Sequence, residues 1–191
     1  MSLAAAVLAG GRSSRMGTTK ALVEIDGCAM ADRVLDAARA IGADPVVIVG
    51  GDPEELASLS APVVADQHPG EGPVGGVLAA LRHFVDAGGG AERVDRVLVL
   101  PCDLAHVDAD TLFPLVEAEA GDGFSQVWVA ATDRLEPMCA IWSVDALDRI
   151  QERFDAGERA LHAVIGELPH AAVTVDPDGL VNINTPDDLP E

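Results

Sequence analysis

The chain has 191 residues, of which 49% are hydrophobic but only 3% aromatic, and its formal net charge is −20. This length fits one domain whose core is built from Ala, Val, Leu and Ile, as is typical of a parallel sheet covered by helices. The charge argues against non-specific binding to nucleic acid or to an anionic membrane. Because no apolar run is long enough to cross a bilayer and the N-terminus lacks the layout of a signal peptide, we expect a cytoplasmic protein.

The chain opens with an apolar run, residues 4–9, that breaks into a loop rich in glycine and basic residues. We interpret it as a buried strand followed by a phosphate-binding loop, because glycines let backbone N–H groups approach a ligand and basic side chains supply countercharge. A plain strand-to-helix turn is the alternative. Lys20 is the only lysine of the chain, which favours a charge needed on a phosphate. The loop contains Gly10, Gly11, Arg12, Arg15, Gly17 and Lys20.

A second candidate site residue follows the next group of elements. The patterns predict, in order, a short strand at 21–25 with a turn at 26–27, a helix at 29–41, a strand at 45–49, a brief helix at 53–59 and a strand at 62–65. This last strand ends at Asp66. A carboxylate at the end of a parallel strand lies at the edge where open α/β sheets bind ligands.

A glycine-rich loop, residues 67–76, precedes a helix predicted at 77–87. Gly72 and Gly75 are candidates for nucleotide binding, because glycines at a helix start expose backbone N–H groups to a phosphate or to the edge of a base. A simple connector between strand and helix is the equally weighted alternative.

Asp103 follows the apolar strand predicted at 96–100, and a carboxylate there can hold Mg²⁺, which takes oxygen ligands from protein and from substrate phosphates. Asp108 and Asp110 are better placed to cap the next helix. The remaining elements are a helix at 111–120, strands at 126–131 and 137–142, a helix from Ser143 to 154, a helix at 160–168, a strand at 172–175 and a helix start at Thr185-Pro186.

Other metal and cofactor chemistry has little support in the sequence. Cys28, Cys102 and Cys139 are odd in number and lack C-x-x-C spacing, so they indicate buried thiols rather than disulfides or a zinc site. The opening loop lacks the G-x-G-x-x-G pattern of dinucleotide dehydrogenases.

With these stretches identified, the sequence resembles the molybdenum cofactor guanylyltransferases, which belong to the nucleotidyltransferase superfamily. The motifs that carry the resemblance are Leu8-Ala9-Gly10-Gly11 with Arg15-Met16-Gly17 and Lys20, Gly72-Pro73-Val74-Gly75-Gly76, Leu100-Pro101-Cys102-Asp103, Ala156-Gly157-Glu158-Arg159 and Asn182-Ile183-Asn184-Thr185-Pro186. The resemblance implies a modified Rossmann fold, a three-layer α/β sandwich with a mostly parallel central sheet. It also implies a single nucleotidyltransferase domain, with a nucleotide-binding part over about residues 1–105 and an acceptor-binding part over about 106–191.

The resemblance further implies transfer of GMP from Mg-GTP to the terminal phosphate of molybdopterin, with release of pyrophosphate. By the same resemblance, the metal is held by Asp103, and the pterin side is formed by Arg15, Asn182 and Asn184. The residues that are expected to contact the nucleotide are Leu8, Ala9, Gly10, Gly11, Lys20, Asp66, Gly72, Gly75 and Asp103. The implied catalytic residues are Arg15, Lys20 and Asp103. Proteins that deliver the cofactor or mature molybdoenzymes are further candidate partners.

Three alternatives stay open at the level of sequence: a cytidylyltransferase acting on molybdopterin, a transferase with another phosphate acceptor, and a non-catalytic module that binds nucleotide. The sequence also departs from many relatives at Thr19, where they carry Asp immediately before the lysine.

Overall fold

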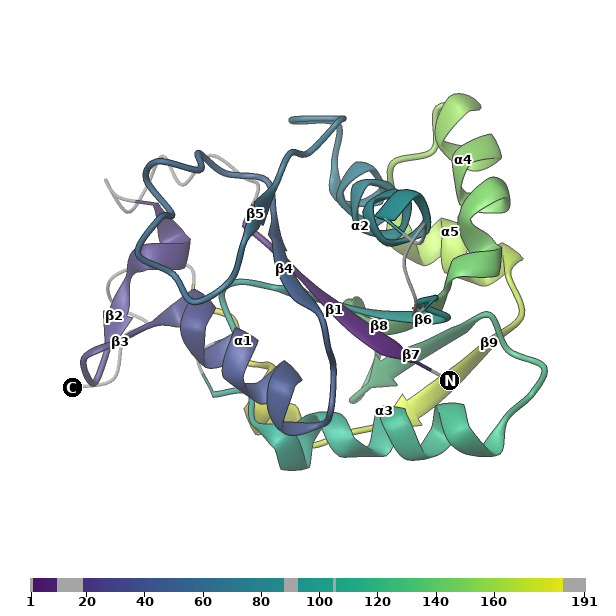
Figure 1. Ribbon diagram of the computed structural model, residues 1–191. Coiled ribbons are helices and arrows are strands. Elements are labelled where there is room, and N and C mark those ends of the chain that lie inside the picture. The colour runs from purple at the N-terminus through teal and green to yellow at the C-terminus, as the bar shows by residue number, and fades with distance from the viewer. Residues whose placement is uncertain (1, 10–18, 88–92, 105, 184–191) are drawn as a thin grey trace.

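A seven-stranded sheet forms the centre of the molecule, with the strand order β5-β4-β1-β6-β8-β7-β9 (Figure 1). The computed structural model describes residues 2–9, 19–87, 93–104 and 106–183. The strands are β1 (Leu3–Leu8), β4 (Val46–Val49), β5 (Val63–Val64), β6 (Arg96–Pro101), β7 (Val127–Ala131), β8 (Leu135–Ser143) and β9 (His170–Thr174). Strand β8 runs antiparallel to both of its neighbours, and the other pairs are parallel. The prediction of a mostly parallel sheet is confirmed.

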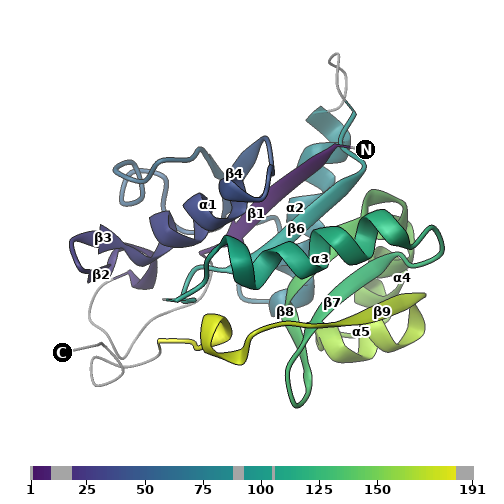
Figure 2. The same cartoon turned by 90° about the horizontal axis from the view of Figure 1, so that it is seen from below.

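Helices cover both faces of this sheet, which gives the predicted three-layer sandwich (Figures 1 and 2). One face carries α1 (Met30–Ala40) and α3 (Ala109–Gly121), and the other carries α2 (Pro73–Ala87), α4 (Leu147–Asp155) and α5 (Leu161–Glu167). Since successive side chains of a strand point to opposite faces, β1 contributes Ala5 and Val7 to the core under α1 and α3. Its remaining buried residues, Ala4, Ala6 and Leu8, pack in the core under α2, α4 and α5.

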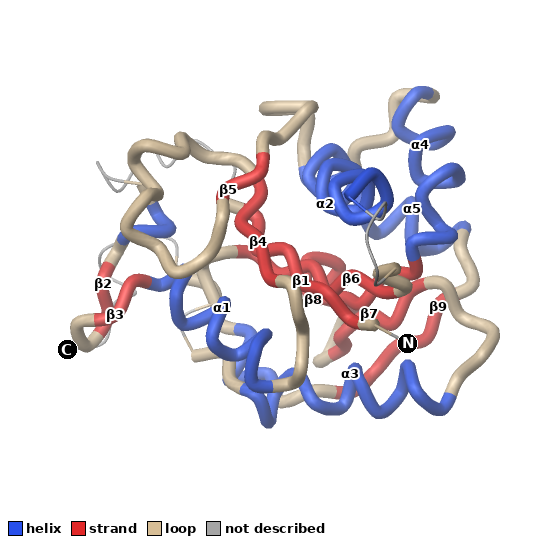
Figure 3. Tube along the Cα trace, viewed as in Figure 1, coloured by secondary structure: helices blue, strands red, loops and turns tan. Residues whose placement is uncertain are grey.

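Strands β1 and β4 are apolar along their whole length, and β6 is apolar after Arg96, as is typical of parallel strands covered on both faces. All four residues of β4 are buried, and so are the middle residues of β6. Figure 3 shows these strands enclosed between the helical layers. Among the described residues, no helix is long and apolar enough to span a membrane.

Two boundary predictions are confirmed by local hydrogen bonding and backbone geometry. The side chain of Asp108 accepts the N–H of Thr111 and caps α3, as predicted, whereas Asp110, the other candidate cap, lies in the first turn of the helix. Asp26 and Gly27, with φ of 53° and 77°, form the turn between β2 (Glu24–Ile25) and β3 (Cys28–Ala29). Positive φ at both central residues of a two-residue turn matches the twist of a hairpin.

Three other predictions are wrong in part. Residues 53–59 form a series of turns and not a helix, because their polar residues leave only Leu56 and Leu59 to bury. Residues 21–25 begin with a short 3₁₀ helix, Lys20–Leu22, and only the end of the segment is a strand. The helix that starts at Ser143 is interrupted: a 3₁₀ turn, Val144–Ala146, precedes α4. Thr185 and Pro186 lie outside the described residues.

Candidate active site

Four neighbouring parallel strands end at one edge of the sheet, and several of the predicted site residues lie there. Ala9 follows β1 and its N–H donates to Val49 O of β4 at 2.9 Å, while Cys102 N–H donates to Leu8 O at 3.2 Å after β6. Because β5 is the outermost of these strands, Asp66 and Asp103 mark the two ends of this edge. The predicted position of these two carboxylates, after β5 and β6 at the carboxyl edge of the sheet, is therefore confirmed.

Lys20 and Asp103 form an ion pair at this edge. The Nζ atom of Lys20, from the 3₁₀ turn before the β2–β3 hairpin, lies 2.7 Å from Oδ2 of Asp103, and the two side chains are only 21% and 16% exposed. An ammonium and a carboxylate that are partly removed from water interact more strongly than they would on an open surface. Two residues that are 83 positions apart in the sequence thus come together where the phosphate-binding loop was predicted.

The segment that carries Asn182 pairs with the backbone of Asp103 and Leu104. Asn182 forms an isolated antiparallel bridge with Leu104, and the N–H of Ile183 donates to Asp103 O at 3.0 Å. Ile183 is 1% exposed and packs against Ile25 and Met30, which anchors this part of the chain under the β2–β3 hairpin. Asn182 is exposed, so its side-chain amide is accessible from solvent.

The Asp103 carboxylate has the features expected of a Mg²⁺ ligand. Its Oδ1 atom is buried and accepts no hydrogen bond within the described part of the chain, whereas Oδ2 is occupied by Lys20. An orphaned buried oxygen is costly unless a cation or donor satisfies it. The described residues hold no cluster of three or more acidic, His or Cys ligands, so this chain fits Mg²⁺ that is held by one carboxylate together with substrate oxygens.

Burial makes the thiol beside Asp103 a poor nucleophile. Cys102 is 7% exposed, and burial, followed by the negative charge of Asp103, raises the pKa of the Cys102 thiol to about 12. The thiolate is the reactive form, and it is scarce near neutral pH with such a pKa. Burial likewise raises the pKa of Cys139 to about 12. The prediction of buried thiols is confirmed for Cys102 and Cys139 and is wrong for Cys28, which is only partly buried.

The glycines before and within α2 have a packing role. The helix begins at Pro73, four residues earlier than predicted, so Gly75 and Gly76 lie in its first turn. A Cβ on Gly76 would lie 3.0 Å from Cδ1 of Leu8, and one on Gly75 would lie 2.8 Å from Cβ of His68. The start of α2 therefore packs closely against the carboxyl end of β1. Gly72, with φ of +85°, adopts a backbone conformation that favours glycine.

A carboxylate lies next to Thr19 although the chain lacks an Asp at that position. The hydroxyl of Thr19 donates to Oε2 of Glu55 at 2.8 Å. Glu55 belongs to the turns after β4, so this hydrogen bond ties the segment before Lys20 to the loop between β4 and β5.

Four of the predicted site residues, Gly10, Gly11, Arg15 and Asn184, lie outside the described residues. Two residues with notable contacts had no predicted role. His68 donates its backbone N–H to Oδ1 of Asp66 at 2.8 Å, and Arg159 contacts the loop that precedes α2 through Glu71. The motif around Arg159 was the only sequence signal for either of them.

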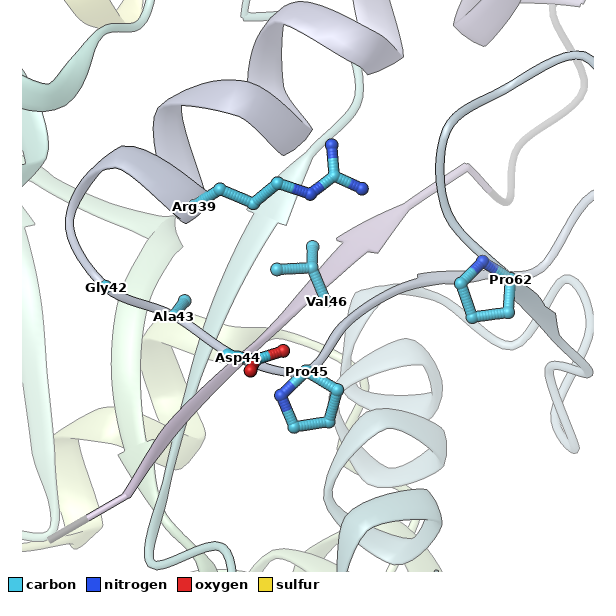
Figure 4. Close-up of a pocket in the computed structure, with 7 residues that line it drawn as sticks. All are labelled: Arg39, Gly42, Ala43, Asp44, Pro45, Val46 and Pro62. Atoms are coloured by element: carbon cyan, nitrogen blue, oxygen red, sulfur yellow. The ribbon is translucent and has the colours of Figure 1, made fainter.

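A surface hollow at the other end of the sheet is unrelated to this site. It is lined by Arg39, Gly42, Ala43, Asp44, Pro45, Val46 and Pro62, where β4 and β5 begin (Figure 4). The guanidinium of Arg39 already donates to Oδ1 of Asp36 at 3.0 Å and to both the hydroxyl and the carbonyl of Ser60. The hollow thus offers no unsatisfied cation for a phosphate.

Comparison with known proteins agrees with this geometry. Residues 5–172 match the family described as the MobA-like NTP transferase domain. The molybdenum cofactor guanylyltransferase of Rhizobium meliloti is 34% identical, over 97% of this chain and 88% of that one, and the protein of the same name from Cereibacter sphaeroides is 32% identical, over 99% and 94%. The crystal structure of molybdopterin-guanine dinucleotide biosynthesis protein A from Archaeoglobus fulgidus superposes with a TM-score of 0.75 at 27% identity, over 96% of this chain and 93% of that one. The chain therefore belongs to the family of MobA-like NTP transferases and is a nucleotidyltransferase.

Proposed function

We propose that the protein transfers GMP from Mg-GTP to the terminal phosphate of molybdopterin and releases pyrophosphate. The observation that carries the proposal is the Lys20–Asp103 pair at the carboxyl end of β1 and β6, directly beside the Asn182 segment. In this proposal Lys20 is the phosphate-binding cation, Asp103 the metal-binding carboxylate and Asn182 the acceptor-side amide. The names of the relatives, guanylyltransferase and guanine dinucleotide biosynthesis protein, support GTP as the donor and molybdopterin as the acceptor.

The nucleotide would lie across the carboxyl ends of β5, β4, β1 and β6. Strands β5 and β6, which Asp66 and Asp103 follow, are three strand spacings apart, about 14 Å. Side chains at the two ends of this edge can reach a nucleoside on one side and its phosphates on the other. In this arrangement the nucleotide would contact Leu8, Ala9, Gly10 and Gly11, and its binding site would also include Gly72 and Gly75. Most of the nucleotide half would be formed by residues 1–105.

The residues of the site would act by position and charge. In-line attack at the α-phosphorus builds negative charge on the non-bridging and leaving oxygens. Lys20 and Arg15 would stabilise that charge, since a preorganised cation needs no reorganisation during the reaction. When bound at Asp103, Mg²⁺ supplies further positive charge to the phosphate oxygens. A phosphate acceptor is already ionised near neutral pH, so the chain needs no dedicated base to activate it.

The acceptor half would comprise residues 106–191, with Asn182 and Asn184 on the pterin. An amide side chain both donates and accepts hydrogen bonds, which suits a polar ring better than a metal. Asn182 is exposed and its backbone pairs with Leu104, the residue after Asp103, which supports a ligand that approaches from that side.

The proposal is tested by incubating the protein with molybdopterin and each nucleoside triphosphate in turn, followed by mass analysis of the product. We expect a guanine dinucleotide, and only with Mg²⁺ present. A cytosine dinucleotide as the main product would replace the proposed donor. Failure with every nucleotide would contradict the proposed acceptor.

Calorimetry checks the metal separately. GTP should bind at least tenfold more tightly with Mg²⁺ than in the presence of a chelator, because Asp103 and the GTP phosphates repel each other without a bridging cation. Equal affinity in both conditions would remove Asp103 from the metal site.

A further inference from the structure

The turn between α4 and α5 holds the backbone of Arg159 in a defined position. Gly157, with φ of +93°, ends the preceding helix in a conformation that favours glycine. The Oε1 atom of Glu158 then accepts the backbone N–H groups of Arg159 and Ala160, both at 2.8 Å. The side chain of Arg159 therefore projects from a backbone that is fixed on both sides.

The guanidinium of Arg159 joins this turn to the loop before α2. Its Nη1 atom donates to the carbonyl oxygens of Phe154 and Glu158 at 2.6 and 2.9 Å. Its Nη2 atom donates to Oε2 of Glu71 at 2.7 Å, and its central carbon lies 3.7 Å from the centre of the Phe154 ring. A planar cation with several donors can satisfy all of these partners at once, which an ammonium cannot do.

The Phe154 ring passes this constraint to His68. Phe154 is 5% exposed, and its ring centre lies 4.5 Å from that of His68. The backbone N–H of His68 donates to Oδ1 of Asp66 at 2.8 Å, and the carbonyl of His68 accepts the N–H of Glu71 at 3.1 Å. The orientation of the Asp66 carboxylate is thus coupled to the segment that Arg159 and Phe154 hold.

The same segment has little room to move toward its neighbours. A Cβ on Gly75 would lie 2.8 Å from Cβ of His68, and one on Gly72 would lie 3.5 Å from Cβ of Arg159. Figure 1 shows α4, α5 and α2 side by side on one face of the sheet, so the α4–α5 turn serves as a fixed support for the start of α2.

We propose that Arg159 is a positioning residue for the nucleotide. Through Glu71, and through Phe154 and His68, it holds Asp66 and the start of α2 in the geometry that receives the nucleoside part of GTP, a statement that rests on the proposed function of Asp66. Arg159 itself touches no substrate. It affects the binding of the donor nucleotide and does not affect the binding of the acceptor.

Hydrogen exchange in the nucleotide-free protein tests the mechanical part of the inference. Arg159→Met keeps the apolar stem and removes the cation. We expect the backbone amides of residues 66–76 to exchange about tenfold faster in this variant. Arg153→Met is a matched control that should leave the exchange of residues 66–76 unchanged. The Arg153–Glu167 pair has the same N–O distance as the Arg159–Glu71 pair, 2.7 Å, and its side chains are 41% and 49% exposed, against 38% and 50% for Arg159 and Glu71. Equal exchange in wild type and Arg159→Met would overturn the inference.

Steady-state kinetics tests the functional part. Arg159→Met should raise KM for Mg-GTP about tenfold, change kcat by less than about twofold and leave KM for molybdopterin unchanged, the pattern of lost ground-state binding. Arg159→Lys, which keeps a cation for Glu71, should restore part of the affinity. On an Asp66→Asn background, Arg159→Met should add less than about twofold, because the two changes disrupt one interaction.

Other outcomes separate the inference from the proposed function. A raised KM for molybdopterin, or a full effect of Arg159→Met on the Asp66→Asn background, would mean that Arg159 contacts substrate directly and would overturn the positioning role. If the wild-type protein showed no turnover of GTP with molybdopterin, the proposed function would fail, while the exchange comparison would still decide whether Arg159 holds residues 66–76.

Discussion

Replacing Lys20 with Ala removes the only lysine of the chain and one half of the ion pair with Asp103. Charge on the leaving pyrophosphate grows as the bond to the α-phosphorus breaks, so a fixed ammonium is worth more in the transition state than in the ground state. Loss of one preorganised donor lowers kcat on the order of 10²-fold, equivalent to about 2.7 kcal/mol of activation free energy. We expect KM for Mg-GTP to rise by less than about fivefold, since part of the interaction exists before the reaction.

The structural cost of this substitution is smaller. The Nζ–Oδ2 distance of 2.7 Å indicates a good charge-assisted hydrogen bond, but both side chains keep some contact with water. We therefore expect the free energy of unfolding to fall by about 1 kcal/mol, too little to unfold the protein. Thermal unfolding of wild type and variant checks this. Arg39→Ala is a control, because it removes one positive charge at the opposite end of the sheet and should leave turnover unchanged.

Amine labelling provides an independent assay. Only Lys20 and the N-terminal amine can react in this chain. Mg-GTP should protect Lys20 from the reagent, and Lys20→Arg should retain partial activity at most, because the guanidinium is broader and directs its donors differently. Near wild-type turnover in Lys20→Ala, together with equal labelling of Lys20 with and without nucleotide, would refute the reasoning.

Three further substitutions test the acceptor side and one helix cap. A Cβ on Gly179 would lie 2.6 Å from Cγ2 of Thr111. Gly179→Ala should therefore lower the free energy of unfolding by about 1–3 kcal/mol and raise KM for molybdopterin but not for GTP. Unchanged unfolding and kinetics would show that the backbone at Gly179 can shift without cost. Asn182→Ala should impair the use of molybdopterin with GTP affinity intact, and the reverse result would assign it to the nucleotide half. The hydroxyl and N–H of Thr111 donate to Asp108 and hold the pKa of its carboxyl below its usual range. The ionised Asp108 therefore stabilises the folded protein above about pH 4, and this stabilisation is lost as the pH falls through the lowered pKa of the folded state. Asp108→Ala should thus lower the free energy of unfolding by about 1 kcal/mol at pH 7. The difference from wild type, measured by chemical denaturation, should become smaller below about pH 4, and a difference that does not depend on pH would contradict the capping role.

The local features of the fold could be predicted because each depends on residues close in sequence. The apolar runs of β4 and β6 required burial on both faces, and Asp108 had the right spacing to cap α3. Asp103 could be recognised because it lies two residues after the end of β6. The sequence also predicted a helix at 53–59, where the structure has turns, since local propensity is decisive only when the helix can also bury an apolar face.

Contacts between distant segments could not be predicted in the same way. The bridge between Leu104 and Asn182 depends on how the C-terminal segment returns to the sheet. The start of α2 at Pro73 depends on close packing against Leu8 and His68, which no local pattern records. The role of Arg159 appeared only once the partners of its guanidinium were known.

The central claim, transfer of a nucleotidyl group, is tested most directly by following the phosphorus atoms of GTP. The protein is incubated with molybdopterin, Mg²⁺ and GTP that carries radioactive phosphorus at either the α or the γ position. We predict that the α label appears in the pterin product and the γ label in pyrophosphate, and that Lys20→Ala slows both in parallel. Transfer of the γ label to the pterin, or release of γ-labelled pyrophosphate while the α label fails to enter the pterin, would contradict the account.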